Sequence, residues 1–315
     1  MRKVVVVTDE AGKPPLGRRY EINGKRLALY RDGEGGPAVV FLPGAGLVGL
    51  EFLNLRERAA ELTTSVLYDR GGTGWSDATE LPRSAEAVAV ELRELLRAAE
   101  IPAPYVLAGH SLGAFYARRY AQLFPGDVAG LLLLDPGHED IYDYLPAEAA
   151  ALNEQMSADV PEVTAEQLEQ SRVALAELYA AWPDSVLGPL IENRLALWRT
   201  GLDETANFES ELYGELRAGG ALPDVPLIVY TAMGRNPYWA QFVSGDLERR
   251  LHEGLHSMHA ALAASVPRGV HRTLDDASHQ YLHVGHTDEL ATAIGELVGN
   301  SRRRGSGAGI DNLGE

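Results

Sequence analysis

The chain has 315 residues, of which 45% are hydrophobic, enough for one large α/β domain with an insertion or for two small domains. The formal net charge of −17 argues against sequence-independent binding to nucleic acid or to an anionic membrane, because both need a basic surface. The absence of cysteine excludes disulfides, thiolate zinc sites and cysteine nucleophiles. No run approaches the roughly 20 apolar residues of a membrane span, and the basic start precedes an apolar run too short for a signal peptide, so a cytoplasmic location is expected.

The first part of the chain is predicted to form strands. Residues 20–30 contain two short strand patterns separated by Asn23-Gly24, a dipeptide typical of two-residue hairpins. A continuous apolar run follows at 38–42, and the next strand is predicted at 65–69. Runs of this kind suit strands that are buried on both faces of a parallel sheet.

Strands and helices then alternate. A helical pattern covers residues 83–100, where apolar side chains recur every three or four positions. A strand at 104–109, a helix at 114–124 and a strand at 128–135 come next. This order predicts an α/β fold with a mostly parallel, doubly wound sheet of about eight strands flanked by helices.

The pattern changes after His138, where several helical stretches follow one another without a strand between them. Strands are predicted again at 226–231 and 271–276, before a last helix that begins at Thr287. We therefore expect helices to be inserted between two strands of one sheet. The expected divisions are an N-terminal extension (1–16), a core (17–137 and 222–300), a helical cap (138–221) and a disordered tail (301–315) that is poor in apolar residues.

A candidate nucleophile lies at the turn between the strand 104–109 and the following helix. Gly109-His110-Ser111-Leu112-Gly113 fits the pattern G-x-S-x-G in the strand–turn–helix context that this motif requires. A sharp turn strains the serine backbone and leaves room only for glycine two residues away on either side. Ser111 could instead be an ordinary helix N-cap, because serine is favoured at that position.

Five motifs, in this order, resemble those of the α/β-hydrolase family. The resemblance covers residues 17 to 300 and implies an α/β core with a helical cap. The motifs are LPGAG (42–46), YDRGGTGWSD (68–77), GHSLG (109–113), LLLLDPGHED (131–140) and DASHQYLH (276–283).

The family order of serine, acid and histidine favours a base on the loop before the last helix. His279 matches the family's usual pattern of a small residue followed by histidine, and His283 and His286 are close enough in sequence to compete. Serine is a poor nucleophile at neutral pH and needs such a base beside it.

The position of the acidic residue departs from the family's commonest pattern, which places an aspartate just after the strand 226–231. No carboxylate follows that strand before Asp246. Some branches of the family place the acid after the preceding strand, where Asp135 stands, and Glu139 and Asp140 are the alternatives. Asp135 is the preferred acid, although Asp-Pro is also a common turn pair.

The neighbouring acidic stretch, His138 to Asp140, could be mistaken for a metal cluster, but adjacent residues do not easily face one ion. No metal site and no cofactor are therefore predicted.

The oxyanion hole is assigned from the resemblance. Its two donors would be the backbone N–H groups of Ala45 and Leu112, and Gly44 lets the backbone approach the substrate closely. The YDRGGTGWSD loop is interpreted as a scaffold that shapes the site, because it lacks the lysine of a phosphate-binding loop.

The leading hypothesis is a serine hydrolase that cleaves a carboxylic ester or a related thioester or lactone through an acyl-enzyme. A serine at the turn argues against the family's epoxide hydrolases and haloalkane dehalogenases. Alternatives with the same residues are amide or C–C hydrolysis, cyanohydrin lysis and acyl transfer, and an alternative of another class is a ligand-binding receptor. The oligomeric state is not predicted.

Aromatic side chains of the expected cap and its borders would favour a small hydrophobic acyl substrate, although many of these rings are expected to form the cap's own core. They are Tyr144, Tyr179, Trp182, Trp198, Phe208, Tyr213, Tyr238, Trp239 and Phe242.

Overall fold

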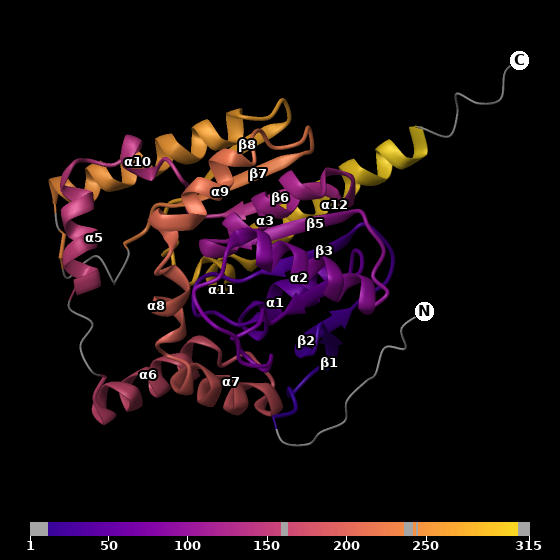
Figure 1. Cartoon of the computed structure of the whole chain (residues 1–315), viewed down its shortest axis with the longest axis horizontal. Coiled ribbons are helices and arrows are strands. Elements are labelled where there is room, and N and C mark those ends of the chain that lie inside the picture. The colour runs from indigo at the N-terminus through magenta and orange to yellow at the C-terminus, as the bar shows by residue number, and fades with distance from the viewer. Residues whose placement is uncertain (1–11, 159–162, 236–241, 244, 308–315) are drawn as a thin grey trace, which may run out of the picture.

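An eight-stranded sheet with the order β1-β2-β4-β3-β5-β6-β7-β8 runs through the computed structural model (Figure 1). The structure describes residues 12–158, 163–235, 242–243 and 245–307. β1 and β2 form the predicted antiparallel hairpin around Asn23-Gly24, and β2 pairs antiparallel with β4. The strands from β3 to β8 pair with one another in parallel. The strands are β1 (Arg18–Ile22), β2 (Lys25–Asp32), β3 (Ala38–Leu42), β4 (Ser65–Tyr68), β5 (Tyr105–His110), β6 (Val128–Leu134), β7 (Leu227–Ala232) and β8 (Gly269–Leu274).

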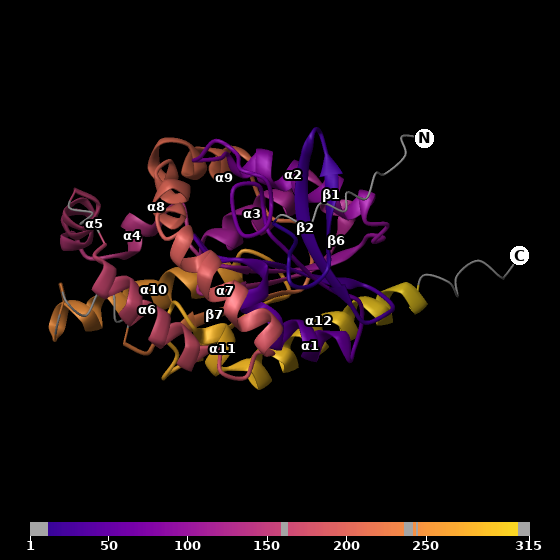
Figure 2. The ribbon, with the colours of Figure 1, turned by 90° about the horizontal axis from the view of Figure 1, so that it is seen from below.

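The central strands are apolar at nearly every position because helices cover both faces of the sheet. In β3, Val40 and Leu42 pack into one hydrophobic cluster, whereas Val39 and Phe41 pack into the other. Helices α2 (Ala85–Ala98) and α3 (Leu112–Leu123) cover the first face, and α1 (Leu53–Ala60) and α12 (Thr287–Gly307) cover the second (Figure 2). The predicted α/β fold is confirmed.

Further helices lie between β6 and β7, where the sequence predicts an insertion. In Figure 1 many of them line the left and lower edges of the molecule, opposite the end of α12. Tyr179 and Trp182 attach them to the core: the Tyr179 hydroxyl donates to Glu51, and the Trp182 indole N–H donates to the Leu50 carbonyl. The helices are α4 (Ile141–Tyr144), α5 (Glu148–Ala158), α6 (Ala165–Leu178), α7 (Asp184–Ala196), α8 (Thr200–Thr205), the π-helical turn η3 (Phe208–Leu212) and α9 (Tyr213–Ala218).

Several helices were not assigned from the sequence. α1 follows the short 3₁₀ helix η1 (Gly49–Phe52) after β3, and α10 (Asp246–Ala264) precedes β8. α10 could have been found, because its buried residues Leu251, Leu255, Met258 and Leu262 follow helical spacing. Outside the inserted segment, the others are η2 (Pro125–Asp127) and α11 (Leu282–Gly285). No helix in the described part of the chain has both the length and the apolar character needed to cross a membrane.

Helix α12 extends into the segment that the sequence predicts to be a disordered tail. α12 continues to Gly307, so residues 301–307 are helical. The physical reason lies in Arg302, whose guanidinium donates to the backbone carbonyls of Gly36 and Leu62. These hydrogen bonds hold the helix end on the core although it is poor in apolar residues. The predictions for residues 308–315, for most of the N-terminal extension, and for Tyr238 and Trp239 lie outside the described residues.

Candidate active site

Ser111 lies in a strained turn between β5 and α3. Its φ of 50° and ψ of −116° are values that a residue with a side chain seldom adopts. Ser111 occupies the N-cap position of α3, yet its side chain makes no capping hydrogen bond. A cap does not account for the strain, whereas presenting the hydroxyl above the edge of the sheet does.

The flanking glycines are needed for space. An ideal Cβ on Gly113 would lie 1.9 Å from the Leu42 carbonyl oxygen, and one on Gly109 would lie 2.6 Å from the Gly113 oxygen. Both distances are far below van der Waals contact, so a larger residue would push α3 away from β3 or from the turn. The turn is therefore possible only with these two glycines.

His279 lies on the loop between β8 and α11, and it contacts both Ser111 and Asp135. The Ser111 Oγ is 3.1 Å from the His279 Nε2, and the His279 Nδ1 is 2.5 Å from the Asp135 Oδ2. An ionised carboxylate can only accept, so the Nδ1–H donates to Asp135 and the Nε2 accepts from the serine hydroxyl. The structure thus brings the three residues selected from the sequence together in one hydrogen-bonded row.

Asp135 directly follows β6 and is 5% exposed. Burial alone would raise the pKa of this carboxyl, but the hydrogen bond and charge of His279, helped by the Ala232 backbone N–H, bring the pKa below its usual value. That N–H donates to the Asp135 Oδ1 at 2.9 Å. The carboxylate is therefore held in one orientation, with its other oxygen toward His279.

The alternative acids and bases have other partners. Both oxygens of Glu139 accept from Arg118, at 2.5 and 2.7 Å, and Asp140 accepts from Arg217 at 2.8 Å. His283 is fully buried and stacks on Phe52, with ring centroids 4.1 Å apart.

His286 contacts Asp276, with 3.4 Å between the Nε2 and a carboxylate oxygen. The neighbours of Ser111 and Asp135 in the tertiary structure thus favour His279 over both competing histidines.

The side chains of His138, Glu139 and Asp140 converge more closely than expected from their adjacency. One ligand atom from each lies within 4.8 Å of the others. However, Arg118 occupies both Glu139 oxygens, and the His138 Nδ1 accepts from the Asp140 backbone N–H. The guanidinium already neutralises the charge that a cation would need, so this cluster is explained by the ion pairs of the loop.

A cavity of about 300 Å³ adjoins Ser111. Its lining includes Phe208 and Tyr213 from the predicted cap, together with Phe115 of α3. These three rings pack on one another, with centroids 5.4 to 6.1 Å apart. Its remaining lining residues are Ser111, Asp135, Pro136, Gly137, His138, Ile141, Ala232, Gly234, His252, Leu255, His259, His279 and Gln280.

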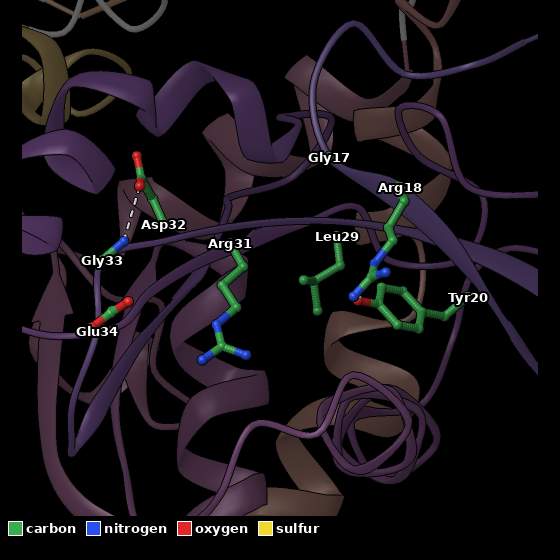
Figure 3. A pocket seen from close by; sticks show the side chains of 8 residues that line it. All are labelled: Gly17, Arg18, Tyr20, Leu29, Arg31, Asp32, Gly33 and Glu34. Atoms are coloured by element: carbon green, nitrogen blue, oxygen red, sulfur yellow. Dashed lines mark hydrogen bonds between the residues drawn. The ribbon is translucent and has the colours of Figure 1, made fainter. Parts of the chain in front are cut away.

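Other predicted aromatic candidates lie elsewhere. Tyr179 and Trp182 are buried against the core, and Phe242 is 45% exposed. A larger hollow of about 690 Å³ lies far along the sheet on β1, β2 and the adjoining turn (Figure 3). In it Arg18 donates to the Tyr20 hydroxyl, and Asp32 accepts from the Gly33 backbone (Figure 3). None of its lining residues belongs to the Ser111 row, and no candidate chemistry is assigned to it.

The loop after β3 borders the strained turn. An ideal Cβ on Gly44 would lie 3.3 Å from the Ser111 Cβ and 2.7 Å from the His110 Nδ1, so only glycine fits there. Leu112 is the first residue of α3, and its backbone N–H has no acceptor in a preceding helical turn. Ala45 and Leu112, the two donors predicted from the sequence, thus lie on segments that flank Ser111.

Buried histidine side chains surround this row. The His110 Nε2 is 2.8 Å from the His279 carbonyl oxygen, to which it donates, and so holds the His279 loop against β5. Burial and the nearby His279 charge lower the pKa of His110 to about 3. Burial also lowers the pKa of His259, whose Nε2 donates to the Pro136 carbonyl at 2.9 Å. Sequence reasoning missed both residues, because their partners are backbone carbonyls far along the chain.

The sheet, the strained serine turn and the adjacent cavity define an α/β-hydrolase fold. A family model described as the alpha/beta hydrolase family matches residues 39–293, and the chain belongs to this family.

Among curated proteins, the chain is 26% identical over 123 residues to the uncharacterized protein YbdG of Bacillus subtilis, covering 38% of each chain. It is 31% identical over 136 residues to the uncharacterized protein YqjL of the same organism, covering 42% of this chain and 54% of that one. The matches thus span 38% and 54% of the length of these two relatives.

Solved structures resemble the chain over most of its length. A thermophilic esterase from Thermogutta terrifontis is 18% identical with a TM-score of 0.58, and the match covers 95% of this chain and 99% of that one. An epoxide hydrolase mutant from Vigna radiata is 15% identical with a TM-score of 0.65, covering 90% and 98%. At such identities the likeness establishes the fold alone.

Proposed function

We propose that the chain is a serine hydrolase that cleaves a carboxylic ester, or a related thioester or lactone, through an acyl-enzyme. The observation that supports the proposal most directly is the row Ser111–His279–Asp135, with its contacts of 3.1 and 2.5 Å, beside a cavity lined with aromatic rings. A base within hydrogen-bonding distance of a serine, itself oriented by a buried carboxylate, is the arrangement that activates a hydroxyl.

In the proposed mechanism the Ser111 Oγ attacks the substrate carbonyl carbon while its proton passes to the His279 Nε2. The developing oxyanion accepts hydrogen bonds from the Ala45 and Leu112 backbone N–H groups. The tetrahedral intermediate then collapses, and the proton on His279 passes to the leaving oxygen, so the alcohol departs and Ser111 remains acylated. Asp135 stabilises the imidazolium in both steps.

Deacylation repeats these steps with water. His279 takes a proton from a water molecule as its oxygen attacks the acyl carbon, and the Ser111 oxygen leaves and takes that proton back. The products are the free carboxylic acid and the regenerated hydroxyl. The mechanism uses a serine nucleophile, unlike the aspartate that the family's epoxide hydrolases carry at this turn, so an ester is preferred over an epoxide.

The volume and the lining of the cavity favour a substrate with a compact apolar acyl group. A volume of about 300 Å³ is at the lower end for small-molecule sites, and its walls include Phe115, Phe208, Tyr213 and Leu255. We therefore propose short acyl esters as substrates in preference to long-chain ones. These four apolar side chains of the cavity wall belong to α3, η3, α9 and α10, respectively.

The proposal is tested by labelling with a fluorophosphonate and by burst kinetics on p-nitrophenyl butyrate. We expect stoichiometric labelling of Ser111, a burst of nitrophenol equal to the enzyme concentration if deacylation is the slower step, and neither signal with Ser111→Ala. Labelling without turnover of esters, lactones or amides would favour a ligand-binding receptor. Absence of labelling would refute the proposal.

A further inference from the structure

Arg70, just after β4, is a buried cation beside the loop that carries Ala45. Its side chain is 1% exposed. Its Nε and Nη2 donate to the two carboxylate oxygens of Glu204, at 2.5 and 2.7 Å. The guanidinium also donates to the backbone carbonyls of Pro43 and Gly44, at 2.8 and 2.7 Å. One side chain thus holds two successive carbonyls of the loop that borders Ser111.

The Gly44 carbonyl and the Ala45 N–H belong to the same peptide group. The Gly44–Ala45 peptide bond is not one of the cis bonds of the described residues, so it is trans. In a trans peptide the C=O and the N–H point in opposite directions. The Leu47 backbone N–H also donates to the Gly44 oxygen, at 3.2 Å. Because Arg70 and Leu47 hold this carbonyl, the Ala45 N–H is directed away from the guanidinium.

Glu204 reaches the same loop from helix α8 of the inserted segment. It is 2% exposed, and its Oε2 accepts from the Gly46 backbone N–H at 2.8 Å. The α8 backbone also touches the loop, since an ideal Cβ on Gly46 would lie 3.0 Å from the Gly201 Cα. The loop from Pro43 to Gly46 is therefore held from the core by Arg70 and from the inserted helices by Glu204.

We propose that Arg70 and Glu204 are positioning residues that set the direction of the Ala45 N–H, so that docking of α8 completes the oxyanion hole. The inference rests on the proposed function, because it assigns Ala45 its role as a donor. The side chains of Arg70 and Glu204 act through the 43–46 loop and take no part in the chemistry.

A purely structural ion pair would behave differently. Breaking a buried pair lowers stability wherever the pair lies, but it has no reason to affect the transition state more than the ground state. Arg118 and Glu139 form a matched control, since they are 4% and 8% exposed and make two hydrogen bonds of 2.5 and 2.7 Å. Loss of that pair tests the general cost of breaking a buried Arg–Glu contact.

The experiment compares Arg70→Lys with Arg118→Lys. Lysine keeps the charge, but its compact ammonium cannot serve a carboxylate and two carbonyls in the guanidinium's planar geometry. For Arg70→Lys we expect kcat on p-nitrophenyl butyrate to fall on the order of 10²-fold, as when one oxyanion donor is lost, with KM changed less than about threefold. Affinity for a trifluoromethyl ketone, which forms an oxyanion on serine, should fall by a similar factor, whereas Arg118→Lys should leave both quantities within about twofold.

Two further variants keep the test decisive if Arg70→Lys does not fold. Glu204→Gln retains the shape and one acceptor, and Arg70→Met with Glu204→Leu removes both charges together. Each should fold and lose kcat and trifluoromethyl ketone affinity in parallel. If the wild type is labelled and active but every folded variant keeps its kcat, the positioning role is wrong. If the wild type is neither labelled nor active, the proposed function itself has failed.

Discussion

Replacing Asp135 with asparagine tests the assignment of the acid most sharply, because the structure determines how the amide must sit. The Ala232 backbone N–H donates to the Asp135 Oδ1 at 2.9 Å, so the amide oxygen takes that position. The amide NH₂ then occupies the place of the Oδ2, which is 2.5 Å from the His279 Nδ1. A donor there requires an unprotonated Nδ1, so the proton of neutral His279 moves to the Nε2.

A protonated Nε2 can no longer accept from Ser111, whose Oγ lies 3.1 Å away. The change should lower kcat on the order of 10⁴-fold, the loss expected when a serine–histidine pair is held in the wrong tautomer. That factor corresponds to about 5.4 kcal/mol in the activation barrier. Rotating the amide the other way would face its NH₂ toward the Ala232 N–H, which exchanges one unfavourable contact for another.

The assay is the initial rate on p-nitrophenyl butyrate from pH 6 to 9, with circular dichroism to show that the variant folds. Glu139→Gln and Asp140→Asn are the controls, and each should keep kcat within about tenfold because their carboxylates pair with Arg118 and Arg217. If Asp135→Asn remains active while either control is inactive, the carboxylate behind His279 has been misassigned.

Two predictions concern stability. Gly113→Ala should lower the free energy of unfolding by about 3 kcal/mol, because the new Cβ would lie 1.9 Å from the Leu42 oxygen. The control Gly126→Ala, at a glycine with open space around it, should change the free energy of unfolding by less than about 0.5 kcal/mol. Equal urea midpoints for the two variants would contradict this reasoning. Acid should also destabilise the fold, because burial, together with the His279 charge, lowers the pKa of His110 to about 3, and burial lowers that of His283 well below its usual value. Below the unfolded value of about 6.5 the unfolded chain binds more protons, so each histidine should cost about 2 kcal/mol by pH 5 and more as the pH falls toward the folded pKa. Urea unfolding at pH 7 and pH 5 measures this loss, and a free energy that does not change over that interval would show that these histidines do not stay neutral in the fold.

The fold was largely predictable because its signals are local. A strand buried on both faces must be continuously apolar, and β3, β5 and β6 carry such runs, so their positions could be read from the chain. The turn at Ser111 was predictable for a similar reason, since its glycines answer a steric need within five residues. The end of α12 was not, because it depends on Arg302 reaching carbonyls more than 200 residues away.

The sequence by itself determined the family's motifs, the α/β order of elements and a short set of candidate side chains: one serine, three histidines and three carboxylates. Only the tertiary structure decided which of these are neighbours. β6, β7 and β8 are parallel, so their carboxyl ends lie at one edge of the sheet, where Asp135 after β6 meets His279 on the loop after β8. Glu139 and Asp140 instead form ion pairs with Arg118 and Arg217. The contact of Glu204 with Arg70, across 134 residues, was likewise not visible in the sequence, because a buried ion pair depends on how inserted helices dock and leaves no local pattern.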